Sequence, residues 1–407
     1  MPMLLLMHVR AHFRYPRHHA YMCSAGSLGY HSFKEMISRA DLGSALLLES
    51  GDLRDVTLAG CNDEEGGNDK DKDRLRGCCL IVHKPGNSYF SRVPEHISNI
   101  TISGNVSTIP HILLSDCSGL KTIELGHLPN VYHILWSFLQ GCKGITSIDL
   151  SPLSNVTYIW NDFMSQCTSL KHIDLSPLSK LEAFPRFFLF ECSSLSSINF
   201  SSLSQISSIG EMFLSRCSML TYIDLSPLTS LKVVESKFLS NCGSLKEIDM
   251  GSIKLEDVGP YYLNECKSLT SIDLSPLSSL SHIKEAFLSG CSGLRSIDLT
   301  PLSSVEWIDE LFMYKCTQLE SIDLSPFAGV QAIDDGFLSH TRLSSIDLSP
   351  LSGLASIGGS FLSHCLHLQS IDLKPLSAVC VDRTNFLMGC TSLTSVDLSP
   401  LRIWEDE

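Results

Sequence analysis

The sequence predicts an α/β solenoid: a right-handed coil with a parallel sheet on its concave face and short helical or 3₁₀ turns opposite. Three observations support this prediction. A triplet of the form Ile-Asp-Leu returns every 25 residues, and twice after 24, from Ile148 to Val396. Apolar and polar residues alternate through each triplet, and an aromatic residue and a cysteine follow it at fixed positions. Such a period is typical of stacked structural repeats, which need no separate globular domains.

The triplet is the expected strand of each unit, which reads L-x-x-I-D-L-S-P-L from Leu170 onward. Side chains alternate between the two faces of an extended chain, so Ile173 and Leu175 point inward while Asp174 points outward. Pro177 ends the strand, because proline has no N–H to donate and restricts the residue before it. Each unit therefore contributes one short strand to a parallel sheet.

The Phe-Leu-x-x-Cys segment is expected to form a short helix or 3₁₀ turn on the outer side. A second apolar pair, Leu181 and Phe184, first turns the coil. Phe188 and Cys192 then stand four residues apart and share one face of a helical turn. Both recur once per unit, which predicts a core column of aromatic rings and a core column of small thiols. Free thiols are expected, since disulfides along a column would strain the stack.

At these positions the repeat resembles the BspA-type leucine-rich repeats of bacterial and protist proteins. The shared pattern is L-x-x-I-x-L, then L/V-x-x-I, then A/F-F-x-x-C-x-x-L. The family unit is nearer to about 23 residues, and it commonly has Ile-Pro where this chain has Asp-Leu-Ser-Pro, so the chain is a long 25-residue variant. The resemblance implies a leucine-rich-repeat fold and a surface-antigen or adhesin-like role in contact with other proteins.

Four segments follow from this organisation. Residues 1–30 are expected to be a disordered tail, and residues 31–97 a small non-repeat region that caps the first coil and contains a charged loop, 62–76. The solenoid itself is expected over residues 98–401, with about 12–13 coils. Residues 402–407 form a short C-terminal tail.

Local patterns predict three elements in the non-repeat region. A capping-box pattern begins at Ser32, and apolar residues at helical spacing follow it, which predicts a helix over 33–49. Short apolar runs predict strands at 56–58 and 79–82.

The outward-pointing middle residue of each triplet gives the candidate binding face. These positions form a column in which only Asn199 is not an acid. Neighbouring strands lie about 4.8 Å apart, and two unit charges at that distance repel by about 0.9 kcal/mol even in water. The column is therefore expected to oppose stability. Its acids are Glu124, Asp149, Asp174, Asp224, Asp249, Asp273, Asp298, Asp323, Asp347, Asp372 and Asp397.

Three interpretations of this acidic column remain open. Repeat duplication would leave solvated carboxylates that are tolerated through neighbouring hydroxyls and raised pKa values. An acidic face would attract a basic protein partner. A ladder of carboxylates would bind cations, of which Ca²⁺ suits hard oxygen ligands best.

Charge and missing motifs limit the function classes. The net charge of −14 argues against a nucleic-acid partner, which needs a basic face. No Walker, H-E-x-x-H, G-x-S-x-G or kinase signature occurs, so no enzyme activity, cofactor or metal is predicted. The sequence predicts a scaffold for protein–protein interaction, with an unidentified and basic partner. The alternative is a structural or surface-antigen protein without a dedicated ligand.

Two further expectations concern the cellular location of the chain and its association with copies of itself. No stretch approaches the about 20 apolar residues of a membrane span. The apolar run at residues 3–7 precedes its basic residues, the reverse of a secretory signal, which favours the cytoplasm; the family resemblance implies the cell surface. The repeat ends at Leu401 with an open strand edge, which predicts self-association at the C-terminal coil.

Overall fold

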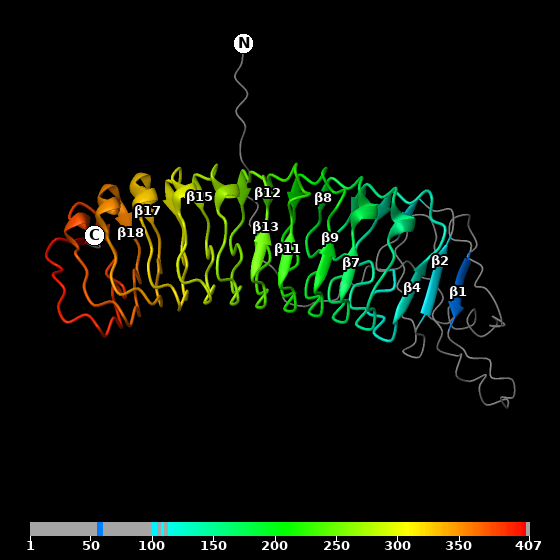
Figure 1. Ribbon diagram of the computed structural model, residues 1–407, viewed down its shortest axis with the longest axis horizontal. Coiled ribbons are helices and arrows are strands. Elements are labelled where there is room, and N and C mark those ends of the chain that lie inside the picture. The colour runs from blue at the N-terminus through cyan, green and yellow to red at the C-terminus, as the bar shows by residue number, and fades with distance from the viewer. Residues whose placement is uncertain (1–54, 60–98, 104–106, 110–112, 404–407) are drawn as a thin grey trace, which may run out of the picture. The chain divides into compact units, whose positions relative to one another are not determined.

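The predicted solenoid is confirmed, and its coils follow one another in a single row (Figure 1). The structure is a computed structural model, and everything it describes belongs to one compact unit, Leu42–Glu407. Buried apolar residues of successive coils form one continuous core. The described residues are 55–59, 99–103, 107–109 and 113–403.

The first ladder consists of the predicted triplet strands, which pair in parallel. β2 (Asn99–Ser103) pairs with β4 (Thr122–Leu125), and β7 (His172–Asp174) pairs with β9 (Ser197–Asn199). β11 (Tyr222–Asp224) and β13 (Glu247–Asp249) form the next pair. The side chains of β4 and β7 alternate between exposed and buried as the triplet predicts. The described triplets after β13 lie outside regular strands.

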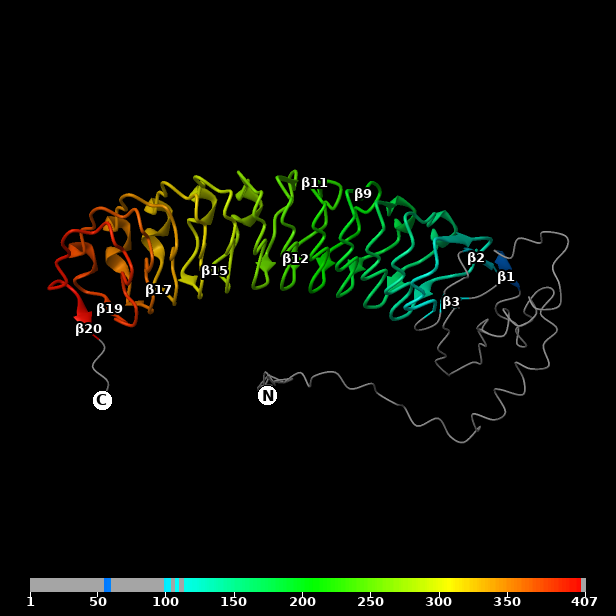
Figure 2. The same ribbon diagram turned by 90° about the horizontal axis from the view of Figure 1, so that it is seen from below.

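A second ladder runs along another face, where the sequence predicted only that a second apolar pair turns the coil. Each strand of this ladder has two residues, and the second residue of the strand is buried wherever the structure describes its side chain. All its pairings are parallel, and Figure 2 shows the ladder along the stack. The strands are β3 (Thr108–Ile109), β5 (His133–Ile134), β6 (Tyr158–Ile159), β8 (Ala183–Phe184), β10 (Ser208–Ile209), β12 (Val233–Val234), β14 (Asp257–Val258), β15 (His282–Ile283), β16 (Trp307–Ile308), β17 (Ala332–Ile333), β18 (Ser356–Ile357), β19 (Cys380–Val381) and β20 (Arg402–Ile403).

The 3₁₀ helices form at Ser-Pro-Leu or at a variant of it with the same proline, between the two ladders. Proline stands near the start of each, where a helix needs no N–H and the fixed φ of proline fits. The helices are η2 (Ser151–Leu153), η3 (Ser176–Leu178), η4 (Ser275–Leu277), η5 (Thr300–Leu302), η6 (Ser325–Gly329), η7 (Ser349–Gly353) and η8 (Lys374–Leu376).

The helical turn predicted at Phe-Leu-x-x-Cys is wrong. Phe187, Leu189 and Glu191 have φ values of 58°, 53° and 58°, in the left-handed region. Every second residue of this segment is left-handed, and the N–H groups of these residues point alternately to the following and to the preceding coil. The amide of Leu189 donates to Phe163 O in the preceding coil at 3.0 Å, and that of Phe187 donates to Glu211 O in the following coil at 2.8 Å. Hydrogen bonds between coils thus alternate with turn bonds within the coil, such as that from the Phe190 amide to Phe187 O at 3.3 Å.

Left-handed backbone costs about 1–2 kcal/mol for a residue with a side chain. Leucine or methionine nevertheless takes the position of Leu189 in coil after coil and is fully buried, as at Leu214 and Leu288. Burial of a leucine side chain is worth about 1.5–3 kcal/mol, which offsets that cost. At the more exposed position of Glu191, three coils have glycine instead: Gly141, Gly290 and Gly389.

The predicted column of aromatic rings is present. Phe163 and Phe188 stack with centroids 5.0 Å apart and an interplanar angle of 8°, and the stack continues to Phe386. Tyr262 takes a phenylalanine position, stays fully buried and directs its hydroxyl to Met250 Sδ at 3.8 Å. These rings run through the core along the whole row of coils.

The cysteine column is also confirmed, and the cysteines that the structure describes are free thiols. Each column thiol from Cys142 on donates to the carbonyl of the left-handed residue one coil earlier; Cys167 Sγ, for example, lies 3.2 Å from Leu139 O. Burial raises the pKa of Cys167 to about 12. Thr341 replaces one cysteine and donates instead to Leu338 O of its own coil at 2.9 Å.

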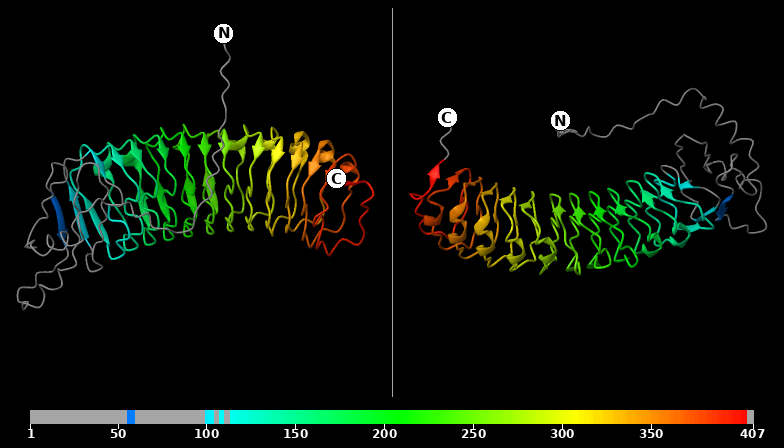
Figure 3. Two further views of the ribbon diagram at one scale, coloured as in Figure 1. Left: turned by 180° about the vertical axis from the view of Figure 1, so that it is seen from behind. Right: turned by 90° about the horizontal axis from the view of Figure 1, so that it is seen from above.

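The N-terminal edge of the first ladder is covered by β1 (Asp55–Ala59), which pairs antiparallel with β2. The strand predicted at 56–58 is therefore confirmed. Figure 3 shows β1 beyond the first coils, at the end of the row opposite β20. In the described part of the chain, no helix has the length and apolar character needed to cross a membrane. Several predicted segments lie outside the described residues: the tail 1–30, the helix 33–49, the loop 62–76 and the strand 79–82.

Candidate binding face

The members of the acidic column in β4, β7, β11 and β13 lie on the surface of the first ladder, whereas Asp149 and the members from Asp273 on lie in triplets outside regular strands. The strand register places Asp174 directly beside Asn199, and Asp224 directly beside Asp249. Column members are exposed, apart from the half-buried Asp224. In these paired strands the structure therefore brings the predicted residues together in one row across neighbouring coils, which are visible side by side in Figure 1.

Every column member from Asp149 to Asp397 also closes a turn of its own coil. Asp149 Oδ1 accepts the backbone N–H of Ser151, two residues later, at 2.8 Å. Such Asx turns hold the chain where the strand gives way to Ser-Pro-Leu. Asn199 makes the same bond through Oδ1, from Ser201 N at 2.9 Å. The other donors are the amides of Ser176, Ser226, Gly251, Ser275, Thr300, Ser325, Ser349, Lys374 and Ser399.

The expectation of raised pKa values is therefore wrong for Asp149, Asp298, Asp347 and Asp397, and the turn-closing bonds were not expected from the sequence. Hydrogen bonding from the side chain of Ser151, and then from its N–H, lowers the pKa of Asp149. The pKa values of Asp298, Asp347 and Asp397 fall for the same reason. Hydrogen bonds to the charged form outweigh the opposing effect of partial burial at these four aspartates. The sequence already contained a sign of these turns, because serine or threonine stands two residues after the aspartate in most units.

Ion pairs within the described residues do not neutralise the aspartates of the acidic column. Within the described residues, no lysine or arginine forms an ion pair with a member from Asp149 to Asp397. Basic residues pair with acids elsewhere, such as Lys232 with Glu256 and Lys284 with Asp257, each at 2.6 Å. The part of the chain that the structure describes contains no group of three or more histidine, cysteine or acidic side chains that could hold a metal ion.

A second surface, on the second ladder, was missed by the sequence analysis. We call it the aromatic patch: Tyr132, Trp136, Tyr158 and Trp160, all at least 37% exposed. The ring of Trp160 meets Trp136 edge to face at 5.2 Å and Tyr158 at 5.7 Å. The sequence did contain a sign of this patch. Two of the four tryptophans of the chain stand in consecutive repeats, at positions outside the core columns.

Solved structures similar to this chain are leucine-rich-repeat proteins of low sequence identity. A leucine-rich repeat protein from Bacteroides ovatus is 19% identical over 70% of this chain and 75% of its own, with a TM-score of 0.45. A leucine rich cell surface protein from Faecalibacterium prausnitzii is 16% identical over 80% and 95%, with a TM-score of 0.38. The functional domain of InlJ from Listeria monocytogenes, described as including a cysteine ladder, is 18% identical over 65% and 63%, with a TM-score of 0.30.

Family assignment comes from the repeats themselves. Among curated proteins, none matches the chain. The model of the BspA type leucine rich repeat region matches residues 84–221, 140–270, 186–306 and 307–403. These matches leave no gap between residues 84 and 403, which is more than half of the chain. The chain therefore belongs to the BspA-type leucine-rich repeat family.

Proposed function

We propose that the chain is a non-enzymatic scaffold that binds a basic protein partner along the acidic column. One observation supports this most. The turn at each column position needs only an Oδ1 acceptor, and Asn199 supplies one as well as aspartate does. Nevertheless, ten of the eleven positions from Asp149 to Asp397 carry aspartate. The charge therefore exceeds what the turn requires.

The chemistry of the column suits lysine and arginine side chains. The Oδ2 atoms of Asp224 and Asp249 make no hydrogen bond within the described residues, so they can accept one from a partner. A row of exposed like charges raises the association rate of an oppositely charged protein, and salt screens the effect. Charge-assisted hydrogen bonds would then fix the register of the partner.

The experiment removes charge without removing the turns. Four substitutions, Asp224→Asn, Asp249→Asn, Asp273→Asn and Asp298→Asn, keep an Oδ1 acceptor at each site. Binding of polylysine and of basic proteins is measured by surface plasmon resonance at rising salt. We expect the affinity to fall by about tenfold or more and the salt dependence to weaken.

The matched control removes four acids that flank β16 and β17 of the second ladder: Glu306→Gln, Glu310→Gln, Asp334→Asn and Asp335→Asn. Partial burial, and then the neighbouring acids, raise the pKa of Glu310 and Asp334, so this is a genuine acidic cluster outside the column. We expect this variant to bind nearly as well as the natural chain. Equal binding by the two variants would contradict the proposal.

A second candidate is a structural or surface-antigen protein without a dedicated ligand. The Asx turns favour it, because they give each aspartate a use within its own coil. Under this alternative, unchanged binding after the four column substitutions is the expected result.

Family membership supports a location at the cell surface. Protease treatment of intact and permeabilised cells would test it. Degradation in intact cells supports the surface, and degradation only after permeabilisation supports the cytoplasm.

Self-association at the C-terminal coil is a separate proposal. β20 pairs with β19 on one side and is the last strand of its described sheet. A second copy of the chain would add a strand on the side of β20 that faces away from β19. Light scattering at rising concentration should then report a dimer, whereas a strict monomer would exclude the proposal.

A further inference from the structure

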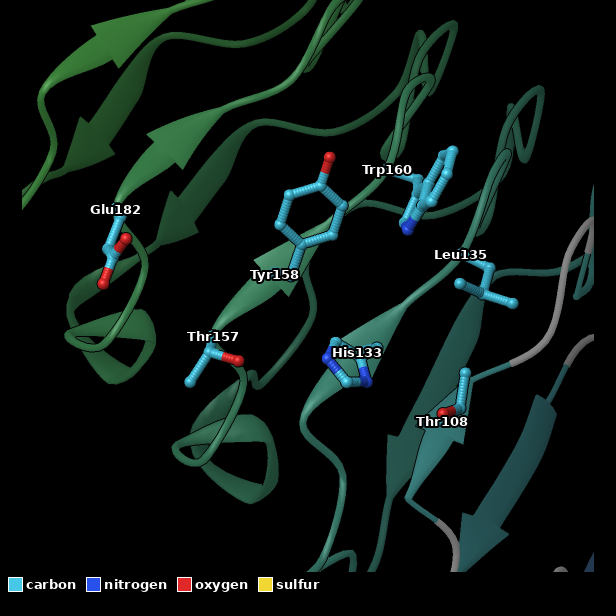
Figure 4. A pocket seen from close by; sticks show the side chains of 7 residues that line it. All are labelled: Thr108, His133, Leu135, Thr157, Tyr158, Trp160 and Glu182. Carbon is cyan, nitrogen blue, oxygen red and sulfur yellow. The ribbon is translucent and has the colours of Figure 1, made fainter.

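The aromatic patch borders a shallow hollow of about 710 Å³ on the second ladder (Figure 4). That volume lies within the about 300–1,000 Å³ of small-molecule sites. The register of β5 and β6 builds the hollow by placing His133 beside Tyr158, while Ile134 and Ile159 point into the core. The lining residues are Thr108, His133, Leu135, Thr157, Tyr158, Trp160 and Glu182.

Exposed aromatic rings and uncommitted polar groups line this hollow. Tyr158 is 50% exposed, yet it lies against Trp160 edge to face. Within the described part of the chain, the Tyr158 hydroxyl, the Trp160 indole N–H, the His133 ring and the Glu182 carboxylate make no hydrogen bond or ion pair. An apolar ligand would leave these groups unsatisfied on burial, at a cost for each.

The charge of the hollow favours a neutral ligand. Glu182 is the one carboxylate among its lining residues, and none is a lysine or arginine. An anion would meet both Glu182 and a chain of net charge −14. A cation would find more carboxylates farther along the same ladder, where Glu310 and Asp334 lie among other acids.

We propose that this hollow binds a neutral oligosaccharide. A pyranose ring has an apolar C–H face, which packs on the ring of Tyr158, and a second sugar unit packs on Trp160, because the two rings are nearly perpendicular at 78°. Its rim of hydroxyls donates to Glu182 and exchanges hydrogen bonds with His133 and the Tyr158 hydroxyl. Strands about 4.8 Å apart present these groups at a spacing comparable to a sugar unit. The inference is independent of the acidic column, whose strand members lie on the first ladder.

The test uses the full chain and neutral hexaoses of glucose, mannose, galactose, xylose and N-acetylglucosamine. Tryptophan fluorescence is a direct readout, because Trp136 and Trp160 are two of four tryptophans. Calorimetry then gives the affinity. At least one hexaose should bind with a dissociation constant below about 10 mM. The double variant Tyr158→Ala, Trp160→Ala should bind it at least about tenfold more weakly.

The matched control is Trp307→Ala. Trp307 is 42% exposed and stands in β16 at the position that Tyr158 has in β6. This variant should bind the sugar as the natural chain does, and so should the four-asparagine column variant, at any salt concentration. Melting temperatures should be unchanged, because all three aromatic side chains lie outside the core.

Two results would overturn the inference. One is no binding of any hexaose at that concentration. The other is an equal loss of binding in Trp307→Ala. If Tyr158→Ala, Trp160→Ala weakens binding of a protein while no sugar binds, the patch is a protein contact and not a carbohydrate site.

Discussion

Removal of one ring from the aromatic column should destabilise the stack strongly. Phe238 is 1% exposed, and its ring centroid lies 6.0 Å from that of Phe213 and 5.5 Å from that of Tyr262. Both neighbours belong to other coils, so they cannot close over the hollow that Phe238→Ala leaves. The expected loss of unfolding free energy is therefore toward the upper end of about 3–5 kcal/mol.

Urea denaturation followed by circular dichroism measures this loss, with the midpoint and slope fitted together. Phe238→Leu is the control, because it keeps most of the apolar volume and should cost only about 1 kcal/mol. Coils contact only their neighbours, so amide exchange should rise most in the coils beside residue 238. A loss below about 1 kcal/mol for Phe238→Ala would show that the rings are not the core of the stack.

Three further predictions concern the turns and the thiols. Asp224→Ala should lower the melting temperature measured by calorimetry, whereas Asp224→Asn should not, because only alanine removes the acceptor of the Ser226 amide; equal effects would contradict the Asx-turn role. The folded-state pKa of Asp149 is lowered, so its contribution is fully present above the unfolded value of about 3.9 and is lost as pH falls through the folded value. Melting temperature should therefore drop in that acidic window, and less in Asp149→Asn. Cys217 should resist iodoacetamide at pH 8 until urea unfolds the chain, because burial raises its thiol pKa; rapid labelling in the native state, followed by mass spectrometry, would contradict this.

The fold could be predicted because the core positions repeat. A buried Ile, Leu, Phe or Cys must meet its equivalent in the next coil, so its period is visible in the sequence. The same spacing misled the prediction at Phe188 and Cys192. A four-residue interval brings two side chains to one face in a helix, and it also does so in turns that alternate left-handed and right-handed residues. The left-handed backbone at Leu189 could not be predicted from the sequence. Leucine rarely adopts this conformation, so its presence gives no sign of it.

The candidate sites divide in the same way. The acidic column was found because it repeats, but its turn-closing role depends on a bond from Asp149 to an amide two residues away. The aromatic patch was missed because Tyr158 and Trp160 depart from the repeat. Only the register of β5 and β6 shows that they share one surface with His133.

Carbodiimide cross-linking of the full chain to a bound lysine-rich partner tests the central proposal most directly. The reagent joins lysine amines to carboxylates in contact, and mass spectrometry identifies the carboxylates. The acidic-column proposal predicts cross-links at Asp224, Asp249 and their column neighbours. Cross-links concentrated at Glu310 and Asp334 on the second ladder, with none in the column, would contradict it.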